Sequence, residues 1–202
     1  MDILNNCSGI YVFEGIDHVG KTTIANQLKE QIEGVIGLKC ESIAFPGNED
    51  QTLGNLVYDI HHHQEKYFFD RLNETSLQLL HVSSHIDLIE RRIKKLSHEN
   101  CIVLLDRFWW STFVYGRVGS LNQETIESII APEKLYWDHI NVKKIFLIER
   151  EDREHDYSNE KEKQIMELYR MLAKKDKKSM LIDNDFDLES TITKIRKQIV
   201  GE

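Results

Sequence analysis

One run of the sequence has the residue types and the spacing that bind a phosphate chain. Residues 15–22, Gly-Ile-Asp-His-Val-Gly-Lys-Thr, match the pattern G-x-x-x-x-G-K-[ST] at each fixed position. The glycines let the backbone turn its N–H groups inward, and a following helix start adds partial positive charge. Lys21 is long enough to reach the β- and γ-phosphates, and the Thr22 hydroxyl is a ligand for Mg²⁺. The run predicts a nucleoside-triphosphate site formed by Gly15, His18, Val19, Gly20, Lys21, Thr22 and Thr23.

An acidic and a basic residue follow the most hydrophobic run of the chain. Residues 101–105, Cys-Ile-Val-Leu-Leu, show no alternation, which favours a strand covered on both faces. Asp106 follows directly and is the carboxylate that we expect near Mg²⁺. Arg107 has the charge to hold a second phosphate group, although a salt bridge at the strand end is the simpler alternative. With Asp106 and Arg107, the predicted site can bind a second phosphate group in addition to the nucleoside triphosphate.

The elements that must position these residues alternate between strands and helices. Strands are predicted at residues 10–13, 38–45, 101–105, 144–148 and 180–182. Helices are predicted at residues 21–33, 52–60, 73–96, 160–173 and 188–200, the third starting with a capping box of Thr75 and Gln78. This alternation predicts an α/β fold with a parallel sheet of about five strands and helices on both faces. With the phosphate loop, it indicates a single domain over residues 1–202, built as the three-layer sandwich of P-loop NTPases.

The overall composition excludes several other classes of protein. The 202 residues include 26 Lys and Arg and 34 Asp and Glu, and the net charge of -8 argues against a nucleic-acid binder. No stretch approaches the roughly 20 apolar residues of a membrane helix, and the first residues lack the features of a signal peptide. We therefore expect a cytoplasmic protein whose partners include neither nucleic acid nor a membrane.

Several short motifs resemble those of thymidylate kinases in order and spacing. That family has F-E-G-[LIV]-D in its P-loop, F-P after the second strand, and D-R-[YF]-x-x-S-x-x-[AV]-Y after the third. The matching residues are Phe13 to Asp17, Gly20 to Thr23, Phe45 and Pro46, Asp106 to Phe108, Ser111 and Tyr115. The resemblance extends from Ile10 to the C-terminal helix. It implies phosphoryl transfer from ATP to a deoxynucleoside monophosphate, most simply dTMP to dTDP, with Mg²⁺ and in a homodimer.

The resemblance also implies roles for individual residues. Asp17 would accept a hydrogen bond from the 3′-hydroxyl of the deoxyribose. Arg107 would hold the phosphate of the acceptor, and Asp106 would organise Mg²⁺ through its waters. Because the nucleophile is a phosphate oxygen, catalysis would depend on positioning and charge rather than on proton abstraction.

A charged segment at about residues 149–160 corresponds to the lid that closes over ATP in this family. Arg153, or alternatively Arg150, would add positive charge there as the phosphoryl group moves. Some relatives carry a basic residue inside the P-loop instead, and His18 occupies that position here. The expected catalytic residues are Lys21, Arg107 and Arg153.

The sequence departs from the family at the acceptor base. The family stacks an aromatic residue on thymine and places an Arg four residues later, and the best alignment puts His81 and His85 there. That spacing keeps both on one helix face. Gly116 stands where a Gln is usual, and no Arg follows Pro46 closely. The expected substrate-binding residues are Asp17, Phe45, His81, His85, Arg107 and Tyr115; a shifted register would bring Phe68 or Phe69 and Arg71 to the base instead.

Alternatives remain for two other clusters and for the function. Trp109 and Trp110 either line the acceptor pocket or pack in the core, and residues 61–63, three histidines, form a surface helix end rather than a metal site. The altered base pocket also suits a kinase of a nucleoside or another small hydroxyl compound, with Glu14 or Asp106 as general base. A non-catalytic P-loop switch is the third possibility.

Overall fold

A five-stranded parallel sheet forms the centre of the chain. The computed structural model describes residues 7–47, 49–67, 71–150, 159–184 and 187–201. The strands are β1 (Gly9–Glu14), β2 (Cys40–Ala44), β3 (Ile102–Asp106), β4 (Val142–Glu149) and β5 (Ser179–Asp183), in the order β2-β3-β1-β4-β5. All four neighbouring pairs are parallel, so the predicted sheet is confirmed.

The register of the central strands aligns the loops that carry the predicted site. Asp106, the last residue of β3, lies opposite Phe13 of β1 and opposite Ala44 of β2. The loops that leave the carboxyl ends of β1, β2 and β3 therefore start side by side. In open α/β sheets this edge is where ligands bind.

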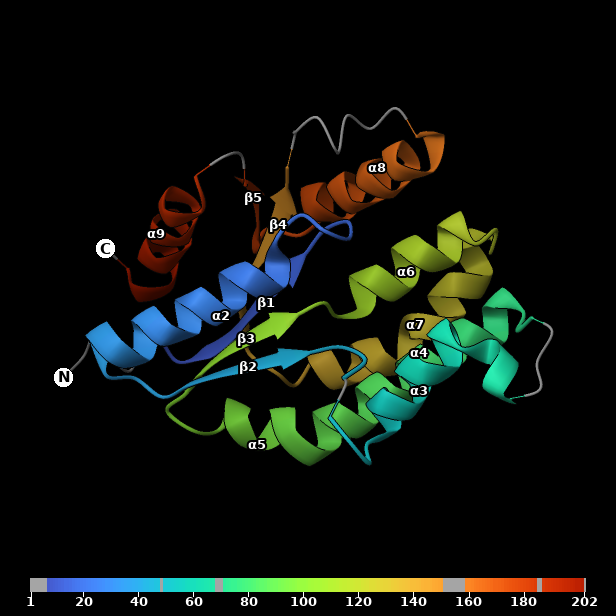
Figure 1. Cartoon of the computed structure of the whole chain (residues 1–202), viewed down its shortest axis with the longest axis horizontal. Helices are drawn as coiled ribbons and strands as arrows, with labels where there is room; N and C mark the ends of the chain where they lie inside the picture. The colour runs from blue at the N-terminus through green and yellow to red at the C-terminus, as the bar shows by residue number, and fades with distance from the viewer. Residues whose placement is uncertain (1–6, 48, 68–70, 151–158, 185–186, 202) are drawn as a thin grey trace.

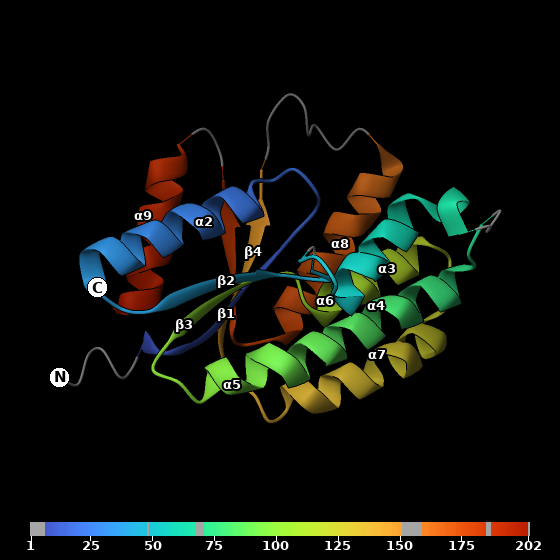
Figure 2. The same cartoon turned by 60° about the horizontal axis from the view of Figure 1, so that its bottom comes forward.

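Helices cover both faces of the sheet, as Figures 1 and 2 show from two directions. On one face, α2 (Lys21–Gln31) packs against α9 (Leu188–Val200). The other face carries α4 (Glu74–Leu88), α6 (Trp109–Val118), α7 (Gln123–Trp137) and α8 (Glu160–Lys175), and α3 (Leu53–His62) packs on α4. The remaining helical segments are η1 (Ile32–Ile36), η2 (Gln64–Tyr67), η3 (Ile89–Ile93) and α5 (Lys94–Ser97). The three-layer arrangement agrees with the prediction.

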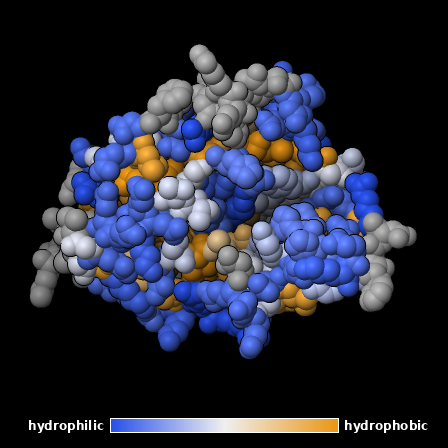
Figure 3. Space-filling view, viewed as in Figure 1, coloured by the Kyte–Doolittle hydropathy of each residue, from blue (hydrophilic) through white to orange (hydrophobic). Residues whose placement is uncertain are grey.

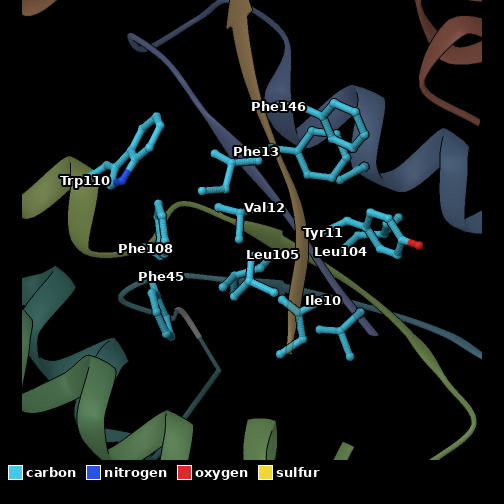
Figure 4. Packing of buried hydrophobic residues seen from close by; sticks show 14 of the residues in the cluster. Ile10, Tyr11, Val12, Phe13, Phe45, Leu104, Leu105, Phe108, Trp110 and Phe146 are labelled. Atoms are coloured by element: carbon cyan, nitrogen blue, oxygen red, sulfur yellow. The ribbon is translucent and has the colours of Figure 1, made fainter. Parts of the chain in front are cut away.

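The side chains of β1 alternate between the two helical layers (Figure 4). Tyr11 faces α9, and its hydroxyl donates a hydrogen bond to the Ile199 carbonyl at 3.3 Å. Phe13 lies on the same side, with its ring centroid 5.5 Å from that of Phe146. Val12 points the opposite way, toward the layer that contains Phe108. Because both faces of the strand are buried, its residues 10–13 are all apolar or aromatic rather than alternating with polar ones.

The sequence patterns predict neither α6 nor α7. Six residues of α6 are buried, from Trp110 to Gly116, so the helix has no narrow apolar stripe to reveal it. α7 does have such a stripe, from Ile126 to Trp137, but it contains the buried Glu133 and the helix contains Pro132. Those two residues disguise the helical pattern, although the apolar residues of α7 are otherwise regularly spaced.

The predicted capping box at the start of the 73–96 helix is wrong. Asn73 is the N-cap, since its side chain accepts a hydrogen bond from the Ser76 N–H at 2.8 Å. Thr75 and Gln78 lie inside α4, and the Gln78 amide donates to Glu74 Oε1 at 2.7 Å. The predicted single helix continues through η3 and α5.

The surface seen in Figure 3 is mostly hydrophilic, with smaller hydrophobic areas between the charged side chains. None of the helices in the described part of the chain has the length and apolar character that a membrane span requires.

Candidate active site

The loop between β1 and α2 depends on glycine at both of its fixed glycine positions. Gly15 has φ 142° and Gly20 has φ 94°, conformations that side chains rarely adopt. A Cβ on Gly15 would lie 2.3 Å from the Ile148 carbonyl oxygen of β4. Asn184, just after β5, donates a hydrogen bond to the Val19 carbonyl at 2.8 Å and packs against Gly20. The loop is therefore held by β4 and by the segment after β5.

Lys21 and Thr22 begin α2 and point to the predicted phosphate site. The Lys21 ammonium is buried and donates to the Ile16 carbonyl, inside the loop, at 2.7 Å. Burial, and then the nearby Arg107 cation, lower the pKa of Lys21 to about 8. A triphosphate here would meet the ammonium and the N-terminal end of α2 together.

Thr22 and Asp106 meet across the loop, as the sequence predicts. The Thr22 hydroxyl donates to Asp106 Oδ2 at 2.6 Å. The other carboxylate oxygen, Oδ1, is buried and has no hydrogen-bond partner among the described residues. A hydroxyl and a carboxylate with a spare oxygen are ligands that Mg²⁺ accepts, so these residues fit the predicted metal.

Asp17 is held between two side chains from the loop and helix that follow β3. Its Oδ1 accepts a hydrogen bond from Arg107 Nη2, and its Oδ2 accepts one from the Tyr115 hydroxyl at 3.0 Å. Burial raises the pKa of Asp17, but Arg107, Lys21 and the Tyr115 hydroxyl lower it by more, so the carboxyl is ionised at neutral pH. The structure thus brings together three of the residues expected to bind the acceptor.

Arg107 has a strained backbone and a network of acceptors. Its φ of 72° is unusual for a residue with a side chain. Its Nη1 donates to the Gly15 carbonyl at 3.2 Å and to Ser111 Oγ at 2.8 Å, and it lies 3.2 Å from the Tyr169 hydroxyl. Such strain persists only where surrounding contacts determine the conformation, and it is common at functional sites.

Glu14 holds the loop after β3 through hydrogen bonds and does not line the cleft. Its Oε1 accepts from the backbone N–H groups of Phe108 at 3.0 Å and Ser111 at 3.1 Å. Its Oε2 accepts from the Ser111 hydroxyl at 2.7 Å. The residue is fully buried, and burial raises its pKa. Glu14 therefore contributes to positioning, which weakens the alternative in which it is a general base.

A cleft of about 730 Å³ joins the phosphate loop to the predicted base site. That volume is in the usual range for small-ligand sites, about 300–1,000 Å³. Phe45, His81 and His85 line it, as expected, and the rings of Phe45 and His85 stack at 4.2 Å and 10°. Burial, followed by electrostatic effects of the neighbouring histidines and of Arg107, lowers the pKa of His81 to about 3. His81 is therefore a neutral ring at physiological pH.

Several residues that the sequence patterns do not predict line the same cleft. Tyr58, His61 and His62 reach it from the end of α3, at the one-turn spacing that could have identified them. The histidines at residues 61 and 62 do end a helix, as predicted, but they also form cleft wall. His61 Nδ1 lies 3.1 Å from His81 Nε2.

Gln78 is another missed residue of the cleft. It precedes His85 by seven residues and so lies on the same face of α4. A Cβ on Gly116 would lie 3.4 Å from the Gln78 side chain. The stem of a Gln side chain from α4 thus lies beside the position where the resemblance leads us to expect a Gln on α6.

Other expected residues lie elsewhere. Trp110 is buried in the core and Trp109 packs on it, so neither lines the cleft. Arg71 is exposed and lies outside the cleft wall. Arg153, Phe68 and Phe69 lie outside the described residues, as does most of the predicted lid.

Comparison with known proteins agrees with these features. A thymidylate kinase of Fervidobacterium nodosum is 30% identical over 199 residues, which cover 93% of this chain and 94% of that protein. A thymidylate kinase of African swine fever virus is 28% identical over 130 residues, or 63% of this chain. The chain spans about half the length of the viral relatives that it matches.

Solved structures give the same fold. The crystal structure of thymidylate kinase from Ehrlichia chaffeensis superposes with a TM-score of 0.74 and 22% identity, covering 95% of this chain and 98% of that one. The thymidylate kinase sequence family matches residues 13–195. The phosphate loop lies at the same sheet edge as Asp17, Asp106 and Arg107, in agreement with that match. The chain belongs to the thymidylate kinase family.

Proposed function

We propose that the chain transfers the γ-phosphoryl group of ATP to the phosphate of dTMP, giving dTDP and ADP. One observation carries the proposal: Lys21 and Thr22 share a single cleft with Asp17, Arg107 and Tyr115. Two phosphate-bearing ligands can therefore meet within it. The names of the relatives support the same activity.

ATP would bind along the loop that contains Gly15, His18, Val19, Gly20, Lys21, Thr22 and Thr23. The inward N–H groups and the Lys21 ammonium would hold its phosphates. Thr22 and the free oxygen of Asp106 would hold Mg²⁺, which when bound neutralises charge on the phosphates.

The acceptor would lie between the phosphate loop and α4. Arg107, which is only 18% exposed, would bind its phosphate, and Asp17 would accept a hydrogen bond from its 3′-hydroxyl. Tyr115 would keep Asp17 in place through the 3.0 Å hydrogen bond. The base would rest against Phe45, His81 and His85.

The position of Glu14 favours a phosphate acceptor over a hydroxyl acceptor that would use this residue as its base. A hydroxyl nucleophile needs a general base within hydrogen-bond reach. Glu14 is fully buried and already accepts three hydrogen bonds. A phosphate oxygen is already a nucleophile, so the reaction would need only positioning and charge.

The predicted lid and Arg153 complete the proposal. β4 ends at Glu149 and runs parallel to β1, so the segment after it leaves from the same sheet edge as the phosphate loop. From there Arg153, or alternatively Arg150, would reach the transferring phosphoryl group. We also propose a cytoplasmic homodimer of one domain per chain, with no nucleic-acid or membrane partner; light scattering in solution would test the dimer.

Release of ADP across a panel of acceptors tests the activity. The panel should contain the deoxynucleoside monophosphates and the matching nucleosides, with Mg²⁺ and ATP in excess. We expect turnover of dTMP well above the other acceptors, and none with Lys21→Ala. Turnover of nucleosides alone would refute the proposal in favour of a hydroxyl kinase. ATP binding without turnover of any acceptor would favour the P-loop switch.

A further inference from the structure

The side chain of Asn184 joins the end of β5 to the phosphate loop. Its amide nitrogen, Nδ2, donates a hydrogen bond to the Val19 carbonyl at 2.8 Å. Because a carbonyl oxygen can only accept, the carboxamide must present its NH₂ group on this side. The backbone N–H of Asn184 donates to the Glu149 carbonyl of β4 at 2.7 Å, and the residue is 5% exposed. The sheet therefore fixes the place from which the carboxamide acts.

This contact determines how the peptide between Val19 and Gly20 is oriented. Among the described residues, Asn184 is the hydrogen-bond partner that the Val19 carbonyl has. The peptide is trans, so its carbonyl and its N–H point in opposite directions. Val19 is fully buried and lies outside the cleft wall, whereas Gly20 lines the cleft. A carbonyl held toward Asn184 thus turns the Gly20 N–H away from Asn184, and within the described part of the chain that N–H donates to no other group.

The backbone of Gly20 does not itself maintain this orientation. Gly20 has φ 94°, and a glycine adopts positive and negative φ about equally readily. Rotation of the Val19–Gly20 peptide plane would therefore meet little steric resistance at Gly20. It would exchange an N–H for a carbonyl oxygen in a loop that binds an anion only while its N–H groups face that anion. The hydrogen bond from Asn184 opposes this rotation.

The second polar atom of the carboxamide argues against a purely structural role. Oδ1 of Asn184 is buried and has no hydrogen-bond partner among the described residues. A buried acceptor without a partner is destabilising, whereas an apolar side chain of similar size avoids that loss. Packing alone therefore does not favour a carboxamide at this position.

We propose that Asn184 is a positioning residue that holds the Val19–Gly20 peptide so that the Gly20 N–H faces the phosphates of bound ATP, a role that rests on the proposed function because it needs ATP in this loop. Asn184 touches neither nucleotide and acts through the peptide alone. Its effect is confined to the phosphate donor, because the acceptor lies against Asp17 and α4.

The orientation of the peptide can be measured by NMR in the unmodified protein. Labelling of valine at the carbonyl carbon and of glycine at nitrogen selects the Val–Gly peptides, of which the sequence has three, ending at Gly20, Gly119 and Gly201. Val118→Ile and Val200→Ile each remove one of the other two signals and so assign that of Gly20. We expect MgADP to shift the Gly20 amide proton downfield by more than the other two, because it donates to a phosphate. A Gly20 signal that does not respond to bound MgADP would overturn the proposal, whether or not any variant of Asn184 folds.

Asn184→Leu separates the positioning contact from packing, because leucine has a similar size and no hydrogen-bond donor. The variant loses the unpaired Oδ1 and leaves the Val19 carbonyl without its partner, so we expect little change in Tm. The calorimetric Kd for ATP should rise about fivefold, the loss of one hydrogen bond, whereas the Kd for dTMP should change by less than about twofold. In the free variant the Gly20 signal should broaden or double, since both peptide orientations become populated. An unchanged Kd for ATP, or equal weakening of ATP and dTMP, would overturn the proposal.

Failure of this role and failure of the proposed function give different results. Because Kd and the NMR shift are measured without turnover, a wild-type protein that binds ATP and shows the Gly20 shift, yet releases no ADP with any acceptor, would refute the proposed function alone. Turnover of dTMP together with a Gly20 signal that ignores MgADP would refute the role of Asn184 alone. A wild-type protein that binds neither ATP nor ADP would refute both.

Discussion

The hydroxyl of Tyr169, on α8, lies 3.2 Å from Nη1 of Arg107 and 2.9 Å from Ser111 Oγ. Tyr169 is completely buried, and burial raises its pKa well above the usual value, so the hydroxyl stays protonated. The helix that follows the predicted lid thus contacts the residue proposed to hold the acceptor phosphate.

Removal of this hydroxyl should weaken acceptor binding without affecting ATP. In Tyr169→Phe the Arg107 guanidinium loses one of its neighbours while the ring still fills the core. We expect the Kd for dTMP, measured by calorimetry, to rise about fivefold, corresponding to about 1 kcal/mol for one hydrogen bond. The Kd for ATP serves as the internal control. Equal weakening of both ligands would indicate a general loss of structure instead.

The sequence predicts those parts of the site whose chemistry depends on local spacing. The phosphate loop needs Gly15, Gly20 and Lys21 at fixed intervals, because one backbone turn must surround a phosphate. Asp106 and Arg107 are found for a similar reason, since they end a strongly apolar strand. The sheet follows from these strands and from their alternation with helices, whereas the α-helices at 109–118 and 123–137 are absent from the prediction.

The base end of the cleft could not be predicted in this way, because its residues meet only through tertiary packing. His85 and Glu133 are 48 residues apart and come from two helices. In the sequence, Glu133 only interrupts the apolar stripe of α7. In the structure, the same residue contacts His85. Gln78 approaches Gly116 only because α4 packs on α6. No spacing rule within one element can reveal such pairs.

His81 should act as a neutral stacking surface rather than as a charge. Burial lowers its pKa to about 3, so it takes up no proton between pH 5 and pH 8. His81→Phe should therefore bind dTMP at least as well as wild type, and His81→Ala should bind it about two- to tenfold more weakly. The ratio of wild-type to His81→Phe Kd values should stay constant from pH 5 to pH 8. A ratio that changes tenfold across that range would show that His81 binds the acceptor as a cation.

Asp106 should set the requirement for magnesium. Its Oδ1 is free of protein hydrogen bonds in the described structure, and its Oδ2 accepts from Thr22. Asp106→Asn keeps the shape but removes the charge, so we expect the Mg²⁺ concentration for half-maximal ADP release to rise at least about tenfold. Chelation of Mg²⁺ should abolish turnover in both proteins. An unchanged magnesium dependence would move the metal site away from this carboxylate.

Arg153 should contribute to the chemical step and little to binding. Arg153→Ala is expected to lower kcat by about 10³, by analogy with arginines that stabilise phosphoryl transfer elsewhere. Single-turnover ADP release at saturating ATP and dTMP measures that step directly. Arg150→Ala is the matched control, because it removes the neighbouring charge. A larger effect of Arg150→Ala would exchange the roles of the two residues.

Gly54, in the first turn of α3, should be intolerant of any side chain. A Cβ there would lie 1.9 Å from the Pro46 carbonyl oxygen and 2.7 Å from its carbon, so backbone must move. We expect Gly54→Ala to destabilise the fold by about 1–3 kcal/mol, a loss that lowers Tm by about 3–10 °C at this chain length. Gly34→Ala is the control, because nothing lies within 4 Å of its Cβ position. Since Pro46 lines the cleft beside Phe45, Gly54→Ala should also raise the KM for dTMP more than that for ATP. An unchanged Tm would mean that α3 is free to shift away from the loop after β2.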